Sequence, residues 1–562
     1  MSWLKKFQHR SQPEQDGFQI DEGDRKPTPQ NPTMLQSFEW HTPPHHYPRL
    51  LRILPALHDL GITSLWLPPG CKGNNFEGNG YDIYDLWDLG EFDQKWRRET
   101  KWGAREELDA VIAKAAELGV RTVWDAVLNH KAAGDEREEC WAVEADQEAR
   151  GTGPTDHRIE LTRPTKINAW LHYNFPGRGD TYSSMKWHAE HFNGTDWDDS
   201  RQRKALFKLV DAPESHPRPG LQSLVKGSKS KKGWADDVSD EHGNADYLMF
   251  NNIDYRHPEA REDVKRWGEW MVRDVGVTGF RLDAVQHYSW KFAREWIECV
   301  KAAGREKGLE EEVFVVGEFW IDDWAKLLTW CERVGQGART YDAPLLYNLS
   351  RASTASEKEV DLRKIFDNTV VGASPASAVT IVRSHDTQPG QASATPLSPF
   401  FRPHAYALTL LRSSGLPCVF FGDLYGTAGP YAEPASCWDR LPNLLLARKL
   451  YAYGAQRDYF DERCCVGWTR AGTWDRRDGC AVVMGVGGGG AAEGKKRMFV
   501  GRERAGEVWT DVLGWVEGEV RVDGMGFGVF RCAGRSVSVW VNGEAEGRER
   551  FPVRLDLDVY RE

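Results

Sequence analysis

The chain has 562 residues, and its 73 Lys and Arg against 84 Asp and Glu give a net charge of −11. A hydrophobic content of 40% with 54 Gly and 28 Pro excludes a low-complexity chain and leaves room for several folded domains. The acidic balance argues against nucleic acid and anionic membranes as partners, because both need a basic face.

Neither a membrane span nor a signal peptide is expected. No apolar run approaches the roughly 18 residues that cross a bilayer. Gln8, His9 and Arg10 follow Lys5 and Lys6, where a signal peptide would have an apolar segment. The ten cysteines are scattered and lack metal-binding spacing. These features predict a cytoplasmic protein with reduced thiols, and we expect a monomer.

Short β-type runs alternate with helical segments from residue 31 onward, after a polar tail at 1–30. Strands are predicted at 34–40, 63–69, 121–130, 278–285, 312–320, 340–346, 377–387 and 415–423, and clear helices at 49–61, 106–119 and 261–276. Eight strands alternating with helices predict an α/β fold, a (β/α)₈ TIM barrel made of residues 31–130 and 246–454. From this rhythm alone, a doubly wound sheet is the alternative.

Two segments depart from the rhythm. Residues 131–245 are rich in Gly, Asp, His and aromatic residues, and they predict an irregular β-rich domain inserted after the third strand. The basic stretch at 226–233 is interpreted as a solvated loop. Residues 455–562 contain six short β-type runs separated by glycine-rich turns, which predict a C-terminal all-β sandwich.

Three predicted strands end in acids at the edge where barrel enzymes place their catalytic groups. Asp283, Glu318 and Asp386 each follow a run of apolar residues. A buried carboxylate is costly unless it is paired or used, so three converging acids predict an active site. Further polar residues lie at the ends of these strands or of the third strand, namely Asp125, Asn129, His130, Arg281, His287 and His385.

The neighbours of two acids suggest different roles. Arg281 and Asp283 are two residues apart on a strand and face the same side, so the guanidinium would hold Asp283 ionised, as a nucleophile requires. Glu318 precedes Phe319 and Trp320, and apolar surroundings would raise its pKa, as a general acid requires. Glycoside hydrolysis with retention uses one charged carboxylate and one protonated carboxyl group.

Several motifs together carry a family resemblance. DAVLNHK (125–131), GFRLDAVQH (279–287), GEFW (317–320) and RSHDT (383–387) resemble the four ordered signature regions of the α-amylase family, glycoside hydrolase family 13. Other segments resemble the bacterial liquefying-type α-amylases, among them 80–92, 175–187, 191–201 and 244–258. The resemblance covers roughly residues 33–540.

The resemblance implies roles for individual residues. Asp283 would be the nucleophile, Glu318 the general acid and then base, and Asp386 the stabiliser of the transition state. The implied substrate-binding residues are Tyr81, Asp125, His130, Arg281, Gln286, His287, Trp320 and His385. The implied reaction is retaining endo-hydrolysis of α-1,4 bonds in starch, glycogen or maltooligosaccharides, through a covalent glycosyl-enzyme.

A Ca²⁺ site between barrel and inserted domain is also implied, with Asn129, Asp246, Asn252 and the carbonyl of His287 as ligands. Oxygen ligands of this kind suit Ca²⁺. Relatives usually carry Asp where this chain has Asn252 and Asn193, so we expect one Ca²⁺ and not their additional metals. The alternative is that these side chains only cap turns.

Other departures leave alternatives open. Gln286 stands where relatives often have Lys, which bears on the balance between hydrolysis and transfer. A 4-α-glucanotransferase using the same site is therefore one alternative. A glucan-binding or glucan-synthesis accessory protein with little turnover is another, suggested by the 25 Trp and the altered metal ligands. Insertions near 205–233 and 351–376 also depart from the family.

Overall fold

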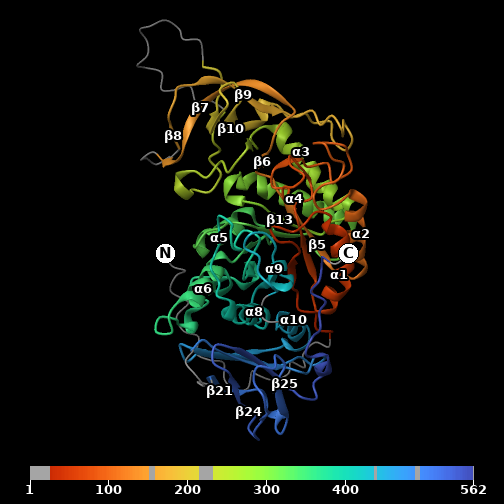
Figure 1. Ribbon diagram of the computed structural model, residues 1–562, viewed down its shortest axis with the longest axis vertical. Helices are drawn as coiled ribbons and strands as arrows, with labels where there is room; N and C mark the ends of the chain where they lie inside the picture. The colour runs from red at the N-terminus through yellow and green to blue at the C-terminus, as the bar shows by residue number, and fades with distance from the viewer. Residues whose placement is uncertain (1–25, 151–157, 214–231, 436–439, 488–493, 561–562) are drawn as a thin grey trace.

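The computed structural model describes residues 26–150, 158–213, 232–435, 440–487 and 494–560 (Figure 1). Most of the expected N-terminal tail and of the basic stretch at 226–233 lies outside these residues. None of the helices in the described ranges combines the length and apolar character that a bilayer crossing needs.

Eight parallel strands close into a barrel in the order β1-β17-β16-β15-β14-β13-β5-β2. They are β1 (Met34–Gln36), β2 (Ser64–Leu67), β5 (Arg121–Ala126), β13 (Gly279–Leu282), β14 (Phe314–Gly317), β15 (Arg339–Tyr341), β16 (Ala378–Ile381) and β17 (Leu416–Phe420). Each overlaps a predicted strand, so the (β/α)₈ barrel is confirmed and the doubly wound alternative is wrong. The sixth strand is shorter than expected, because the Asp342 side chain accepts a hydrogen bond from Leu345 N–H and starts a helix.

Helices surround this barrel (Figure 1). They are α1 (His46–Asp59), α2 (Arg105–Glu117), α3 (Pro258–Trp270), α4 (Trp290–Lys307), α5 (Trp324–Val334), α6 (Ala343–Thr354), α7 (Val370–Ala373), α8 (Arg402–Leu410), α9 (Phe421–Tyr425) and α10 (Arg440–Tyr451). Helix α2, which overlaps the helix predicted at 106–119, buries Leu108, Val111, Ile112 and Ala115 on one face. The core therefore lies between the helical ring and the strands.

The inserted segment forms an antiparallel sheet at one end of the molecule (Figure 1). Its strands are β6 (His130–Lys131), β7 (Glu136–Arg150), β8 (Arg158–Glu160), β9 (Thr165–His172), β10 (Phe192–Asp198), β11 (Arg203–Leu209) and β12 (Asn251–Ile253). The order is β6-β12-β10-β11-β7-β8, and β9 pairs with β7. Strand β12 belongs to this sheet although it lies beyond residue 245, where we expected the insertion to end.

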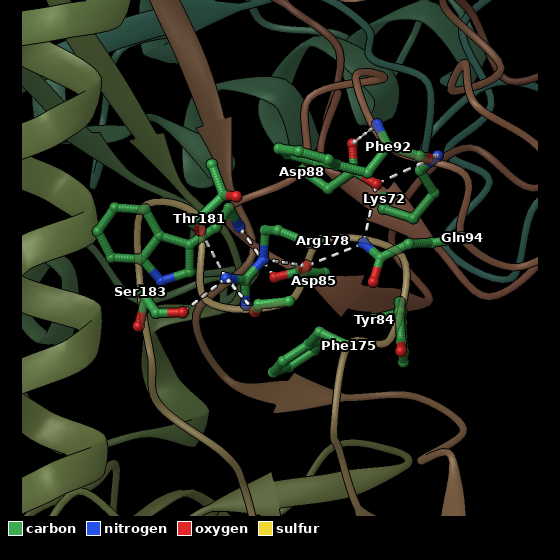
Figure 2. A network of polar contacts seen from close by, with 12 residues as sticks. Lys72, Tyr84, Asp85, Asp88, Phe92, Gln94, Phe175, Arg178, Thr181 and Ser183 are labelled. Carbon is green, nitrogen blue, oxygen red and sulfur yellow. Dashed lines mark hydrogen bonds and ion pairs between the residues drawn. The ribbon is translucent and has the colours of Figure 1, made fainter.

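A buried polar network joins the insertion to the loop that follows β2 (Figure 2). This loop contains a short hairpin, β3 (Lys72–Gly73) and β4 (Ile83–Asp85). Arg178 Nε lies 2.7 Å from Asp85 Oδ2, and both side chains are fully buried. Gln94 Nε2 bridges Asp85 and Asp88 at 3.0 and 2.9 Å, and Lys72 pairs with Asp88 at 3.2 Å. Charged contacts thus hold the insertion against the barrel.

The C-terminal region contains two antiparallel sheets. The larger has the order β18 (Gln456–Tyr459), β19 (Cys465–Arg470), β20 (Cys480–Gly485), β25 (Val537–Asn542), β22 (Val508–Asp511) and β23 (Val520–Arg521). The smaller pairs β21 (Gly494–Phe499) with β24 (Phe527–Cys532). Buried residues of both sheets share one core, among them Val483, Met498, Phe530 and Trp540. The predicted all-β sandwich is confirmed.

Gly317 ends β14, directly before the predicted acid Glu318. A Cβ atom at Gly317 would lie only 2.3 Å from Trp330 Cη2, because the α5 indole packs against this strand end. The constraint is steric, since any side chain here would displace either the strand or the indole. Glycine at this position therefore sets where Glu318 emerges from the barrel.

We predict that Gly317→Ala lowers the free energy of unfolding by about 1–3 kcal/mol, the usual cost of overpacking a core. Urea denaturation followed by tryptophan fluorescence measures the change. Gly524→Ala is the matched control, because a Cβ there meets no atom within 4 Å. Equal stability of the two variants would show that the Trp330 contact does not constrain the strand.

Candidate active site

Arg281 is the centre of the predicted site and its side chain is fully buried. Its Nη1 lies 2.6 Å from Asp125 Oδ1 and 2.6 Å from Asp283 Oδ1, and its Nη2 lies 2.9 Å from Glu318 Oε1. Strand β13 lies between β5 and β14 in the barrel, with Arg281 in register with Asp125. Three neighbouring strand ends thus place three carboxylates around one guanidinium.

The turn after β13 fixes two of these carboxylates relative to each other. Ala284 follows Asp283 in a left-handed conformation with φ 47°, which is uncommon for a residue with a side chain. In this conformation its N–H donates to Glu318 Oε2 at 3.1 Å. Glu318 thus contacts a guanidinium and a backbone N–H. The expectation of apolar surroundings for Glu318 is therefore wrong, because the turn and Arg281 surround it with donors.

Asp386 joins the same cluster. Its Oδ2 lies 3.2 Å from His385 Nε2, and burial, followed by the Glu318 charge, raises the pKa of Asp386 well above its usual range. The raised pKa favours the protonated form of Asp386 beside the Glu318 carboxylate. The structure therefore brings together the three acids that the sequence predicts.

An aromatic wall borders the acids. Tyr81 stacks on His385 with ring centroids 5.3 Å apart and planes at 2°, and Trp40 stacks on both rings at 6.4 and 6.0 Å. Tyr81 Oη donates to Asp125 Oδ2 at 2.9 Å and lies 2.8 Å from His385 Nε2. Burial, followed by the Arg281 charge, lowers the pKa of His385 well below its usual range, so this ring is neutral.

Sequence reasoning missed three residues of this wall. Trp40 is one, and Trp66 is another, whose indole N–H donates to Asp125 Oδ2 at 3.0 Å. The third is Gln36, whose amide lies 2.7 Å from His385 Nδ1. Gln36 ends β1, so the strand-end rule that selected the acids would have found it, whereas Trp66 lies within β2, before its last residue.

The remaining predicted substrate residues lie at different places. His130 Nε2 bonds to the Tyr81 carbonyl at 2.8 Å, and burial lowers the pKa of His130 to about 4. His130 thus supports the Tyr81 backbone. Gln286 lines a cavity of about 380 Å³ together with Tyr288 and Trp330. Trp320 is half-buried and packs against the barrel core.

The predicted metal ligands also converge. Asp246 accepts hydrogen bonds from Asn193 Nδ2 at 2.7 Å and from Asn252 Nδ2 at 2.8 Å. Asn129 is close by, because its carbonyl accepts from the N–H of residue 253 at 3.0 Å. His287 Nδ1 lies 2.7 Å from the carbonyl of residue 245, next to Asp246.

These residues fit a hard cation. Asn129 Oδ1 and Asn252 Oδ1 are both buried, and neither has a hydrogen-bond partner within the described part of the chain. Burial raises the pKa of Asp246 to about 7, as expected for a carboxylate that lacks a compensating charge. Two orphaned amide oxygens beside one carboxylate are a donor set that suits Ca²⁺.

Comparisons with known proteins agree with this geometry. A family model described as "Alpha amylase, catalytic domain" matches residues 51–473. The chain is 41% identical over 515 residues to an α-amylase of Bacillus licheniformis, covering 91% of this chain and 93% of the relative. It is 37% identical over 522 residues to the cytoplasmic α-amylase of Escherichia coli (strain K12), covering 91% and 99%.

Solved structures show the same fold. The α-amylase of Geobacillus thermoleovorans, complexed with acarbose, matches with a TM-score of 0.56 at 13% identity. The match covers 91% of this chain and 98% of that one. At this identity the likeness shows the architecture and nothing finer.

The position of Asp125 predicts how stability depends on pH. Burial raises its pKa to about 7, against the opposing effect of Arg281, whereas an unfolded Asp titrates near about 3.9. Between these values the folded chain binds a proton that the unfolded chain does not. The stability from Asp125 is therefore fully present below about pH 4 and is lost as the pH rises through about 7.

We predict that the stability of the wild type relative to Asp125→Asn falls between pH 4.5 and 7.5, by at most about 1.4 kcal/mol per pH unit. Urea unfolding at several pH values measures it. The exposed Asp558→Asn variant should follow the wild type throughout. Parallel curves for wild type and Asp125→Asn would contradict the assignment.

Proposed function

Because the chain belongs to the α-amylase family and is therefore a glycoside hydrolase, we propose that it cleaves internal α-1,4-glucosidic bonds of starch, glycogen or maltooligosaccharides with retention. The observation that carries this proposal is the single buried guanidinium of Arg281, which contacts both Asp283 and Glu318. Retention requires two carboxyls close enough to act on one anomeric carbon.

In the first step, Asp283 would attack the anomeric carbon while the glycosidic C–O bond breaks. Arg281, 2.6 Å from the Asp283 carboxylate, stabilises its charged form until the new bond forms. Glu318 would give its proton to the departing oxygen. In the free chain the raised pKa of Asp386 favours a proton on that carboxyl, and sugar hydroxyls that bind Asp386 would favour transfer of this proton to Glu318.

In the second step, water would attack the same carbon and release Asp283. Glu318, now ionised, would take the proton from this water, which restores the starting state. Asp386 would hydrogen-bond the hydroxyls of the distorted sugar, where the positive charge develops. Two inversions at one carbon give net retention.

The aromatic wall would hold the sugar at this carbon. Tyr81 offers a ring face, and Trp40 extends the same stack. His385 is neutral and buried, so it can donate or accept a hydrogen bond without adding charge. His130 would act beside Tyr81, Gln286 would act on the leaving-group side, and we propose Trp320 and His287 as further substrate-binding residues. The relatives named α-amylase at 41% and 37% identity support an α-glucan as the ligand.

We predict that Asp283→Asn lowers the rate of reducing-end release from soluble starch by at least about a thousandfold, because the nucleophile is lost. Glu318→Gln should lower it by about 10²–10⁴-fold. The matched control is Asp558→Asn, which changes an exposed Asp and should retain full rate. Thermal unfolding confirms that each variant is folded.

Product analysis on maltoheptaose distinguishes the alternatives. Hydrolysis gives only shorter maltooligosaccharides, whereas a 4-α-glucanotransferase also gives longer ones. Equal activity of wild type and Asp283→Asn would refute the assigned nucleophile. Starch binding without turnover would instead identify an accessory protein.

We also propose one Ca²⁺ between barrel and insertion, held by Asn129, Asp246, Asn252 and the carbonyl of His287. The two orphaned amide oxygens support it. When bound, this cation would supply charge compensation for Asp246 and rigidity at the junction. With Asn at 193 and 252, Asp246 is the only carboxylate in this group, so we propose one Ca²⁺ and no additional cation beside it at this junction.

Chelation should therefore destabilise the chain. With free Ca²⁺ at 100 times its dissociation constant, binding adds about 2.7 kcal/mol to the stability. We predict that EGTA lowers the melting temperature of the wild type by several degrees and leaves that of Asp246→Asn unchanged. Differential scanning calorimetry measures both. A chelator effect of the same size in the variant would exclude this residue as a ligand.

We also propose that the protein acts in the cytoplasm as a monomer. The relative of Escherichia coli named a cytoplasmic α-amylase supports the location. The scattered cysteines agree, since those that the structure describes are all free thiols.

A further inference from the structure

The inserted sheet carries a cluster of histidines and glutamates that the proposed reaction does not use. Glu138 lies in β7, His172 ends β9, and His188 precedes the 3₁₀ turn η2 (Ala189–His191). One potential ligand atom of each of these three residues lies within 4.8 Å of the other two. Glu136 faces the same place, because it pairs with His172 across β7 and β9.

We propose that Glu136, Glu138, His172 and His188 form a binding site for a divalent transition metal ion of the Zn²⁺ class. The site would tie the β7–β9 pair to the turn that follows His188. It is separate from the Ca²⁺ site proposed above, which offers amide and carboxylate oxygens and no imidazole side chain.

The distances between ligand atoms suit such an ion. His188 Nδ1 lies 2.6 Å from Glu138 Oε1. His172 Nδ1 lies 3.4 Å from Glu136 Oε2 and 4.0 Å from Glu138 Oε1, both longer than an ordinary hydrogen bond. Ligand atoms around a tetrahedral Zn²⁺ are about 3.3 Å apart, given bonds of about 2.0–2.1 Å. Movements of about 1 Å would therefore complete the coordination.

The carboxylates of Glu136 and Glu138 are each held by an N–H donor that is not part of the cluster. Glu138 Oε2 accepts from the N–H of Ala189 at 2.6 Å, and Glu136 Oε1 accepts from Asn174 Nδ2 at 3.0 Å. Each glutamate thus has one oxygen held by an N–H donor and the other near the imidazoles. Such outer partners are typical of metal sites, because they fix the direction of the ligands.

Charge and access also agree with a dication. Two carboxylates balance a charge of +2, and imidazole is a ligand preferred by Zn²⁺, Cu²⁺ and Ni²⁺. The exposed fractions of the side chains are 24% for Glu138, 21% for His172 and 38% for His188. An ion can therefore enter from solvent without unfolding the sheet.

A neighbouring cluster has similar composition but the wrong chemistry. Glu190, His191 and His257 also place ligand atoms within 4.8 Å of one another. However, the N–H of His188 donates to His191 Nδ1 at 2.8 Å, which occupies the lone pair of that nitrogen. The proton of neutral His191 is then on Nε2, which lies 3.4 Å from Glu259 Oε2. His191 Nδ1 is therefore not available to a metal, and its Nε2 lies next to Glu259, which is not part of the cluster.

The test uses the full chain, stripped with a chelator and returned to buffer with excess Ca²⁺, so that the oxygen site is filled. Titration with Zn²⁺ alone in a calorimeter should show one equivalent bound. His172→Asn and His188→Asn should each weaken this binding by at least about tenfold. His257→Asn, in the neighbouring cluster, should leave it unchanged.

Co²⁺ gives a second readout, since tetrahedral coordination by nitrogen and oxygen produces visible absorption that the His172→Asn/His188→Asn double variant should lack. Thermal unfolding without metal shows whether each variant folds. Zn²⁺ binding of equal strength in the wild type and the double variant would overturn the proposal, as would no binding by the wild type. Neither outcome depends on glucan cleavage.

Discussion

The site depends on one buried positive charge. Arg281 contacts Asp125, Asp283 and Glu318 and is completely shielded from water. Without it, three carboxylates at adjacent strand ends would repel one another in a low dielectric, and desolvation would favour their neutral forms. The guanidinium therefore permits three acids to gather at this edge of the barrel.

Around this charge, the backbone has little freedom. Gly317 admits the Trp330 indole against the end of β14, and Ala284 turns through a left-handed conformation to reach Glu318. Strain of this kind persists only where the surrounding structure enforces it. The barrel supplies that enforcement, since β5, β13 and β14 are neighbours in one closed sheet. Rigid elements, more than loops, thus carry the proposed chemistry.

The sequence was sufficient to predict the architecture and the three acids. Strands and helices recur with a regular period, and each acid stands at a defined position, the end of a strand. Strand and helix periods predicted the barrel, and the strand-end rule predicted the meeting of Asp283, Glu318 and Asp386. The sequence was not sufficient to predict the hydrogen-bond donors that surround Glu318. The donors around Glu318 come from a left-handed turn, and no local motif announces a positive φ at an alanine. Trp66 was missed because its function comes from a single indole N–H within an apolar strand.

The junction between barrel and insertion has an implication for how this fold can be divided. Arg178 comes from the insertion, whereas Asp85, which it neutralises in full burial, comes from the loop after β2. Excising the insertion would remove the partner of this buried carboxylate, and breaking a buried ion pair by removing one partner typically costs about 3–5 kcal/mol. The barrel and the insertion therefore depend on each other. A variant that lacks the insertion would also need an uncharged residue in place of Asp85.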